Sequence, residues 1–392
     1  MLRRVATFAA IALLAASCGD DDNGGGAESG GGENGGPITL GYVGDFSDIY
    51  SFYDIPIREG AEFAIEEINA EGGVLGRKLE LVSRDGRNDQ QQSIRFAEEL
   101  ISERGVNYMI GTTSDPFIAI GTLACQPGVP ISTGDSTAPQ LVADIGDCAY
   151  QIVMSDNAQG GVAGEYAAQQ GYKTALVLGS TEIPYTNNLP RYFSEAFERA
   201  GGRILGREEF RIDAGDYSPQ VTKIANMSPQ PDVIFTPMFI PDTPVFMRQL
   251  RAAGVDIPVV STDGNHDPAL LKAGDAVEGM VFTTHALPRE GTELGDFFAR
   301  FEQETGNAPS SVVTGVGYDE IQFLKAALEK AGSAEPEAIM EALATTTVEG
   351  VTGEIAMDPE TRRSEKPVTL VEVKGGEFAF VDQFVPEFVP DP

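Results

Sequence analysis

The sequence predicts an α/β protein with two similar lobes, each built around a parallel β-sheet. Strand-like and helix-like segments alternate through most of the 392 residues, and this alternation is typical of parallel strands joined by right-handed crossovers. The second half of the chain repeats the strand–helix order of the first half. A chain of this length also divides into two domains more readily than it forms one. In such folds, ligands are expected beyond the carboxyl ends of the strands.

The N-terminus has the features of an export signal. Arg3 and Arg4 make its start positive, residues 5–16 form an uncharged apolar run, and small residues precede Cys18. This order resembles a bacterial lipoprotein signal, in which the Cys becomes the lipidated first residue of the mature protein. The run is too short to span a bilayer, and ordinary secretion with an incidental Cys18 is the alternative. We expect a signal peptide over residues 1–17 and an extracytoplasmic protein, in the periplasm or at the cell surface, held to a membrane by a lipid on Cys18.

The next segment and the overall charge limit the partners of the chain. Residues 18–36 are rich in Gly and Asp and cannot bury enough apolar surface to fold, which predicts a flexible tether. The 60 acidic and 27 basic residues give a net charge of −33. Such a surface repels phosphate backbones, so we expect no nucleic acid partner. It also repels anionic headgroups, so membrane contact would come from the lipid.

The folded part begins near Pro37, and its first half alternates strands with helices. Ala61, Ile65 and Ile68 share one helical stripe, which Gly72-Gly73 ends. The expected strands cover residues 38–44, 78–82, 107–110 and 129–132, and the expected helices cover residues 58–69, 91–103 and 116–124.

The second half continues this alternation and ends in a β-rich tail. Its first expected helix is closed by Gly201-Gly202, as the first helix of the chain is closed by a glycine pair. The expected strands cover residues 174–178, 203–210, 232–236 and 258–261, the expected helices cover residues 191–200, 217–226, 244–253, 315–331 and 336–345, and the tail covers residues 368–385.

Two cysteines besides Cys18 are present, Cys125 and Cys148. In an oxidising compartment such a pair most simply forms one disulfide, which would stabilise the fold by roughly 3 kcal/mol. Two buried free thiols are the alternative. The two histidines, His266 and His285, do not stand at ligand spacing from a cysteine, so we expect no metal site.

Motifs that would indicate an enzyme are missing from the sequence. It has no Gly-x-Ser-x-Gly elbow, no His-Glu-x-x-His and no phosphate-binding loop. Paired carboxylates such as Glu66-Glu67 and Glu98-Glu99 fall on expected helices, where they form solvated faces. We therefore expect a protein without catalytic residues and without a cofactor.

Several segments together resemble a known family. The helix from Gly60 to Asn69 runs into Gly72-Gly73-Val74-Leu75-Gly76-Arg77-Lys78-Leu79, and further matches in the same order are Ile110-Gly111, Gly128-Val129-Pro130-Ile131, Thr137-Ala138-Pro139 and Asp263-Gly264-Asn265-His266-Asp267-Pro268. Their order and spacing resemble the leucine-binding-protein-like family, the substrate-binding proteins of ABC importers for branched-chain amino acids and amides. The resemblance covers residues 37 onward.

This resemblance implies the type I periplasmic-binding fold, an α/β fold of two similar Rossmann-like lobes with parallel sheets joined by a three-crossover hinge. We place the crossovers near residues 155, 286 and 350. Lobe 1 would then comprise residues 37–155 plus 286–350, and lobe 2 residues 156–285 plus 351–392. We expect a monomer whose partners are a small-molecule ligand and an ABC permease in the membrane.

Two short segments of the first half are candidates for binding a carboxylate. Thr113-Ser114-Asp115-Pro116 and Ser136-Thr137-Ala138-Pro139 each place capping side chains before a proline at an expected helix start. Free N–H groups and the positive end of a helix dipole favour an anion there. The resemblance implies that Thr113 or Ser114, together with Thr137, hold the ligand carboxylate beside the backbone of Asp135. Ordinary N-caps facing solvent are the alternative.

The remaining site residues are also implied by the resemblance. Asp263 stands where the family binds the α-ammonium, and Tyr53 and Tyr185 stand where aromatic residues wall the pocket. Phe239 stands where the family often has Tyr, so its ring can only pack. Asp135 departs from the small neutral residue that is common there, and facing the pocket it would repel a ligand carboxylate. Either its side chain points away, or the ligand carries more positive charge than leucine does.

The sequence therefore predicts an extracytoplasmic solute-binding protein. It would capture a small polar solute, such as an amino acid, an amide or an amine, and deliver it to an ABC importer by closing its lobes around the solute. A receptor module that reports the same ligand to a signalling partner is the alternative, because both functions use one cleft.

Overall fold

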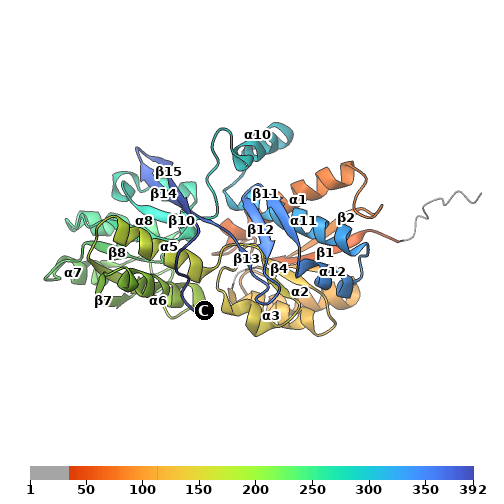
Figure 1. Ribbon diagram of the computed structural model, residues 1–392, viewed down its shortest axis with the longest axis horizontal. Coiled ribbons are helices and arrows are strands. Elements are labelled where there is room, and N and C mark those ends of the chain that lie inside the picture. Colours follow the sequence, from red (N-terminus) through yellow and green to blue (C-terminus); the bar gives the residue numbers. More distant parts are fainter. Residues whose placement is uncertain (1–34, 113) are drawn as a thin grey trace, which may run out of the picture. The chain divides into compact units, whose positions relative to one another are not determined.

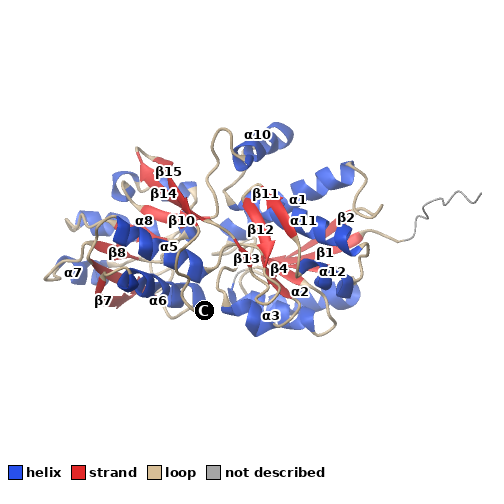
Figure 2. Cartoon of the chain, viewed as in Figure 1, coloured by secondary structure: helices blue, strands red, loops and turns tan. Residues whose placement is uncertain are grey.

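The predicted parallel sheets are present in a computed structural model that describes residues 35–112 and 114–392, without the side chains of Ser114 and Asp115. The predicted signal peptide, Cys18, nearly all of the predicted tether and Thr113 lie outside the described residues. Strands gather in two main groups flanked by helices (Figure 1, Figure 2). Within the described part of the chain, no helix is both long enough and apolar enough to cross a membrane.

The first sheet is parallel and forms the centre of lobe 1. Its strand order is β2 (Leu79–Asp85), β1 (Ile38–Gly44), β3 (Tyr108–Ile110), β4 (Ile131–Thr133) and β5 (Ala149–Gln151). One face packs on α1 (Ser51–Ala70), α10 (Glu293–Thr305), α11 (Val313–Ala331) and α12 (Pro336–Leu343). The other face packs on α2 (Gln90–Glu98), α3 (Ser114–Cys125) and α4 (Gln140–Ile145), and α2 continues as the π-helical turn η1 (Glu99–Glu103). Because successive strand residues point to opposite faces, Leu40 and Tyr42 enter the first of these cores and Val43 enters the second.

The second sheet forms the centre of lobe 2. Its order is β15 (Glu377–Phe384), β14 (Val368–Lys374), β10 (Val281–Thr284), β9 (Val259–Ser261), β8 (Val233–Phe235), β6 (Thr174–Gly179) and β7 (Arg203–Glu209). The strands from β10 to β7 are parallel, and β14 and β15 add an antiparallel pair. One face packs on α7 (Ser218–Ala225), α8 (Asp242–Ala252), α9 (Pro268–Leu271) and η3 (Gly274–Val277), and the other on α5 (Asp156–Gln169) and α6 (Pro184–Arg199).

A third, small sheet belongs to lobe 1 and extends past residue 350, where the sequence placed the boundary between the lobes. Its strands β11 (Thr347–Gly350), β12 (Gly353–Met357) and β13 (Ser364–Glu365) are antiparallel and lie beside α11 (Figure 1). Ile355 and Met357 are buried in the core of lobe 1, and the Asp319 carboxylate of α11 accepts the N–H of Val351 at 2.6 Å. The chain joins the second sheet only at Val368, so the third crossover lies at residues 366–367, after this hairpin rather than before it.

Two helices begin earlier than the sequence predicts. The expected starts were residues 58 and 191, whereas α1 begins at Ser51 and α6 at Pro184. Both helices contain a proline near the N-terminus, Pro56 and Pro190. A proline inside a helical pattern argues for a boundary at that point, yet both helices continue through it. At Pro190 the Thr186 carbonyl, which lacks an N–H from the proline, accepts the N–H of Ser180 at 3.1 Å instead.

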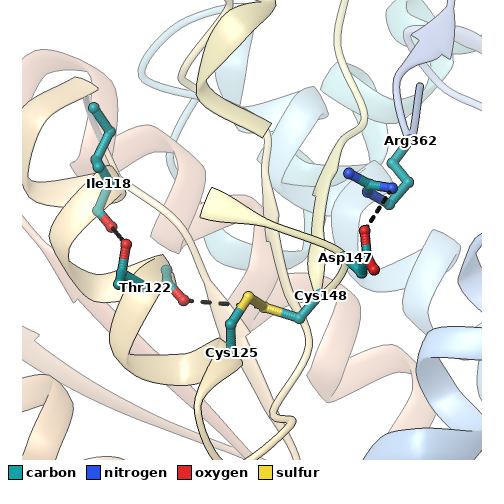
Figure 3. Close-up of a disulfide and its surroundings, with 7 residues drawn as sticks. Ile118, Thr122, Cys125, Asp147, Cys148 and Arg362 are labelled. Carbon is teal, nitrogen blue, oxygen red and sulfur yellow. Dashed lines mark hydrogen bonds and ion pairs between the residues drawn. A yellow bond between two sulfur atoms is a disulfide. The ribbon is translucent and has the colours of Figure 1, made fainter. Parts of the chain in front are cut away.

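Cys125 and Cys148 form a disulfide (Figure 3). It joins the end of α3 to the residue before β5, at the edge of the first sheet where the strands begin. Nearby, Arg362 lies 3.2 Å from the Asp147 carboxylate, but that carboxylate is 99% exposed, so the ion pair adds little stability. The covalent link therefore secures the α3–β5 edge of lobe 1.

Candidate functional site

A cavity with an empty volume of about 600 Å³, part of it open to solvent, is lined by residues of both lobes. The lining residues of lobe 1 are Tyr50, Tyr53, Gly134, Asp135, Ser136, Thr137, Ala138 and Val313. Those of lobe 2 are Ile183, Tyr185, Phe239 and Asp263, together with His285 directly after β10. Apart from Val313, at the start of α11, these residues follow the carboxyl ends of β1, β4, β6, β8, β9 and β10. The position agrees with the rule for open α/β sheets.

Six of the residues that the sequence singled out line this cavity. They are Tyr53, Asp135, Thr137, Tyr185, Phe239 and Asp263. Thr113 lies outside the described residues, and Ser114 is the first residue of α3, its side chain not described. Sequence reasoning missed Tyr50, Ile183, His285 and Val313. For His285 a signal was available, because it directly follows the Val281–Thr284 strand.

The loop after β4 does not cap a helix in the way the sequence suggested. α4 begins at Gln140 with Pro139 at its N-cap, and no side chain caps it. Instead, Thr133 Oγ1 accepts the N–H groups of Asp135 at 3.1 Å and Ser136 at 2.8 Å, and the Ser136 hydroxyl donates to the carbonyl of Thr112 at 2.7 Å. The prediction that Ser136 and Thr137 are N-caps is therefore wrong. These bonds fix the loop, and they occupy the N–H groups of Asp135 and Ser136 and the Ser136 hydroxyl.

Asp135 lines the cavity. Its Oδ2 atom is buried and has no hydrogen-bond partner among the described residues. Burial raises the pKa of this carboxyl well above its usual value, and the carboxylates of Asp54, Asp263 and Glu320 raise it further. The position therefore holds an acidic group to which the described neighbours supply no positive charge.

Asp263 belongs to the short helix η2 (Asp263–Asn265) and is held in place by Tyr185. The Tyr185 hydroxyl donates to Asp263 Oδ1 at 2.8 Å, lies 2.7 Å from Thr262 Oγ1 and accepts the N–H of Gly264 at 3.2 Å. His285 Nε2 lies 3.5 Å from Asp263 Oδ2. Burial, assisted by Lys366, lowers the pKa of His285 to about 3, so this histidine is neutral near pH 7. Burial also raises the pKa of Asp263. Asp263 thus presents a positioned carboxyl group for which the described residues provide no cationic partner at this pH.

Aromatic rings form much of the remaining wall. The Tyr50 and Phe239 ring centroids are 6.2 Å apart, and Tyr185 meets Phe239 edge to face at 6.2 Å. Tyr53 reaches across from α1, since a Cβ added to Gly264 of lobe 2 would lie 2.8 Å from the Tyr53 hydroxyl. The rings supply apolar area and negative faces that attract cations.

Three further carboxyl groups are buried around the cavity. Asp54 accepts from the Tyr42 hydroxyl at 2.5 Å and the Thr112 hydroxyl at 2.6 Å, and Glu320 accepts from Ser132. Burial raises the pKa of Asp54, Glu320 and Asp156 to about 7 each. No Lys or Arg is among the lining residues in the described part of the chain, and these described residues contain no cluster suited to a metal ion. The electrostatic character of the site is therefore acidic.

Comparison with known proteins identifies the family. A family model described as periplasmic binding protein matches residues 37–377. The chain belongs to this family. The sequence resemblance and the two-lobed fold are thereby confirmed, and the chain is an extracytoplasmic solute-binding protein of the ABC-importer class rather than an enzyme.

Individual relatives support the assignment. The leucine-, isoleucine-, valine-, threonine- and alanine-binding protein of Pseudomonas aeruginosa is 28% identical over 331 residues, which cover 82% of this chain and 84% of that protein. The structure of the leucine-binding protein LivK of Thermotoga maritima is similar with a TM-score of 0.81 at 28% identity, covering 89% of this chain and 99% of that one. A solute-binding protein of Rhodopseudomonas palustris, in complex with 3,4-dihydroxybenzoic acid, has the same fold, with a TM-score of 0.81 at 24% identity over 90% of this chain and 99% of that one.

Proposed function

We propose that this periplasmic binding protein captures a small solute bearing an ammonium group, as an amino acid, an amino amide or an amine does, and delivers it to an ABC importer. One observation carries the proposal: Asp263 presents a positioned carboxylate to a cavity without a described Lys or Arg in its lining. Charge-assisted hydrogen bonds to a carboxylate are the stronger kind, and they favour a cationic donor. The Pseudomonas relative, a leucine-, isoleucine-, valine-, threonine- and alanine-binding protein, and the Thermotoga leucine-binding protein support it.

Closure of the lobes is the proposed mechanism of capture. The solute contacts Tyr53, Asp135 and Thr137 on lobe 1 first, and lobe 2 then brings Asp263, Tyr185 and Phe239 over it. The hinges are the crossovers at residues 152–155, 285–292 and 366–367, which divide the chain into lobe 1 (37–151 plus 293–365) and lobe 2 (156–284 plus 368–392). Binding stabilises the closed state only through contacts that the open state lacks, and the permease recognises the closed state.

The test is calorimetric titration of the purified protein with compounds that share one carbon skeleton. L-Leucine, L-leucinamide and 3-methylbutylamine carry an ammonium group, whereas 4-methylpentanoate does not; phenylalanine, phenylalaninamide, 2-phenylethylamine and 3-phenylpropanoate repeat the comparison with an aromatic side chain. We expect binding only among the ammonium compounds, and a loss of at least tenfold in affinity in Asp263→Asn. Equal binding of the carboxylates, or unchanged affinity in Asp263→Asn, would contradict the proposal. Uptake of the bound solute should also fall in cells that lack this protein.

We propose in addition that the mature protein is a monomer tethered to a membrane by a lipid on Cys18. The support is the order of charge, apolar run, small residues and cysteine in the sequence. Cys18→Ala should move the protein from the membrane fraction to the soluble fraction, and an unchanged distribution would contradict the anchor.

A further inference from the structure

We infer that the cavity selects a compact organic cation that has no free carboxylate, an amine or an amino amide, whose nitrogen lies between Asp135 of lobe 1 and Asp263 of lobe 2. The inference rests on the proposed function, because it names the substrate class of the same cavity. It depends on the acidic residue at position 135.

The loop carrying Asp135 has few free hydrogen-bond donors for a carboxylate. The N–H groups of Asp135 and Ser136 donate to Thr133 Oγ1, and the Ser136 hydroxyl donates to the Thr112 carbonyl. A ligand carboxylate would have to break these bonds to use the same donors. It would also come beside the Asp135 side chain, and two carboxylates in one poorly solvated site disfavour each other's charge.

Both sides of the cavity carry acidic groups for which the described residues provide no cationic partner. Asp135 Oδ2 is buried with no hydrogen-bond partner among the described residues. On the other side, the neighbour of Asp263 is His285, which is 4% exposed, is neutral near pH 7 and has its Nδ1 atom unpaired among the described residues. A bound ammonium group would supply the missing positive charge to both carboxylates, whereas an anion would meet none.

Aromatic rings form a wall of the cavity that suits an organic cation. Tyr50, Tyr53, Tyr185 and Phe239 line the same cavity as the two carboxyl groups, and cations are attracted to the faces of such rings. An ammonium group attached to an apolar skeleton would place its charge between the carboxylates and its carbon atoms against the rings. The wall therefore suits an organic cation better than a metal ion.

Proton release on binding is a second measurement that tests the inference. Because burial and the neighbouring carboxylates raise the pKa of Asp135, its protonated form is more favoured in the ligand-free cavity than it is for an aspartate in water. A cation favours the ionised form, so binding should release protons and should strengthen as the pH rises. The titratable groups that act on Asp135 from the surrounding elements are Asp54 on α1, Glu320 on α11, Asp263 on η2, and the hydroxyls of Tyr42 on β1 and Tyr53 on α1. Asp156, Tyr185 and His285 in turn lie around Asp263.

The experiment compares the acid, amide and amine of each skeleton in the intact protein and in Asp135→Asn, which has nearly the same shape. In the wild type we expect the amides and amines to bind at least tenfold more tightly than the parent amino acids. In Asp135→Asn this preference should shrink at least tenfold, and the affinity of the amines should depend less on pH between 5 and 8. Calorimetry in two buffers of different ionisation enthalpy should show proton release in the wild type and less in the variant.

The outcomes separate the two proposals. If leucine or phenylalanine binds as tightly as its amide and its amine, the inference is overturned while the proposed function stands. If Asp135→Asn is folded, judged by its melting temperature, but keeps the wild-type preference, the inference is also overturned. If none of the ammonium compounds binds, the proposed function and the inference both fail.

Discussion

At the residue scale, Tyr185 connects the Asp263 carboxyl group to the backbone of lobe 2. Its hydroxyl contacts Asp263 Oδ1, Thr262 Oγ1 and the N–H of Gly264. A hydrogen bond to a charged group contributes more than one between neutral groups, and here it also fixes the position of the carboxylate. The sequence indicated both residues through the family resemblance, but no pattern in the sequence indicated the bond between them.

Replacing Tyr185 by Phe should therefore weaken solute binding while the ring still fills its place. We expect about a tenfold loss of affinity, which corresponds to about 1.4 kcal/mol for one hydrogen bond to a charged group. Isothermal titration of the tightest-binding amine measures it. Tyr192→Phe on the same helix is the matched control, because Tyr192 does not line the cavity. Equal affinities in the two variants would contradict the role of the Tyr185 hydroxyl.

At the element scale, most of the buried parallel strands were predictable, whereas β5, β10, the β11–β12 hairpin and several helices were not. Short buried strands such as β6 and β9 show as apolar runs between polar turns. By contrast, α5 is buried nearly all round and contains Gly160, Gly161 and Gly164, so it lacks the polar face that would show a helical period. The β11–β12 hairpin was missed because its core contacts are made with α11, which no local pattern reveals.

The turn that carries Asp263 depends on a glycine at its second position. A Cβ at residue 264 would lie 2.5 Å from Phe239 Cβ and 2.8 Å from the Tyr53 hydroxyl. Gly264→Ala should therefore push Tyr53 of α1 away from lobe 2 and lower solute affinity more than tenfold. Gly206→Ala in β7 is the matched control, since its Cβ would make an ordinary 3.4 Å contact with Leu176. Wild-type affinity in Gly264→Ala, measured by titration, would contradict the close approach of the lobes at this turn.

The disulfide secures an edge of lobe 1 away from the cavity. Cys125 and Cys148 are 23 residues apart, and closing a loop of that size stabilises the fold by about 3 kcal/mol on the chain-entropy model. Replacing both cysteines by Ser should lower the free energy of unfolding in guanidinium chloride by that amount. Solute affinity should stay the same, because the bond lies where the strands begin and the cavity lies where they end. A large loss of affinity with unchanged stability would contradict this assignment.

At the scale of the whole molecule, acidity dominates both the surface and the interior. The net charge is −33, and Asp54, Asp156 and Glu320 are buried around the cavity with pKa values raised to about 7. The sequence revealed the surface charge and the anomaly at Asp135. It could not reveal the buried carboxyl groups, because Asp54 and Glu320 lie in helical segments where acidic residues are usually solvated, and only the packing of α1 and α11 buries them.

The buried carboxyl groups should make the empty protein less stable as the pH rises. Their pKa values in the unfolded chain are near 4, so the folded state binds more protons between about pH 4 and pH 7, and the free energy of unfolding falls over that range. The melting temperature should therefore be higher at pH 5 than at pH 8. Glu320→Gln should reduce this difference, because the amide can still accept from Ser132 but does not ionise.

High salt separates this effect from general charge repulsion. Salt screens the repulsion between exposed carboxylates but acts much less on buried groups, so a difference between pH 5 and pH 8 should persist at high ionic strength. A melting temperature that rises from pH 5 to pH 8 would contradict the burial of ionisable carboxyl groups.

The central claim is that the cavity between the lobes holds the ammonium group of a solute. The most direct test is a crystal structure of the protein with the amine or amide that binds most tightly. The solute nitrogen should lie about 3 Å from a carboxylate oxygen of Asp263, and the solute's carbon skeleton should pack against Tyr50, Tyr53 and Phe239. A solute whose nitrogen points away from Asp263, or one bound outside this cavity, would contradict it.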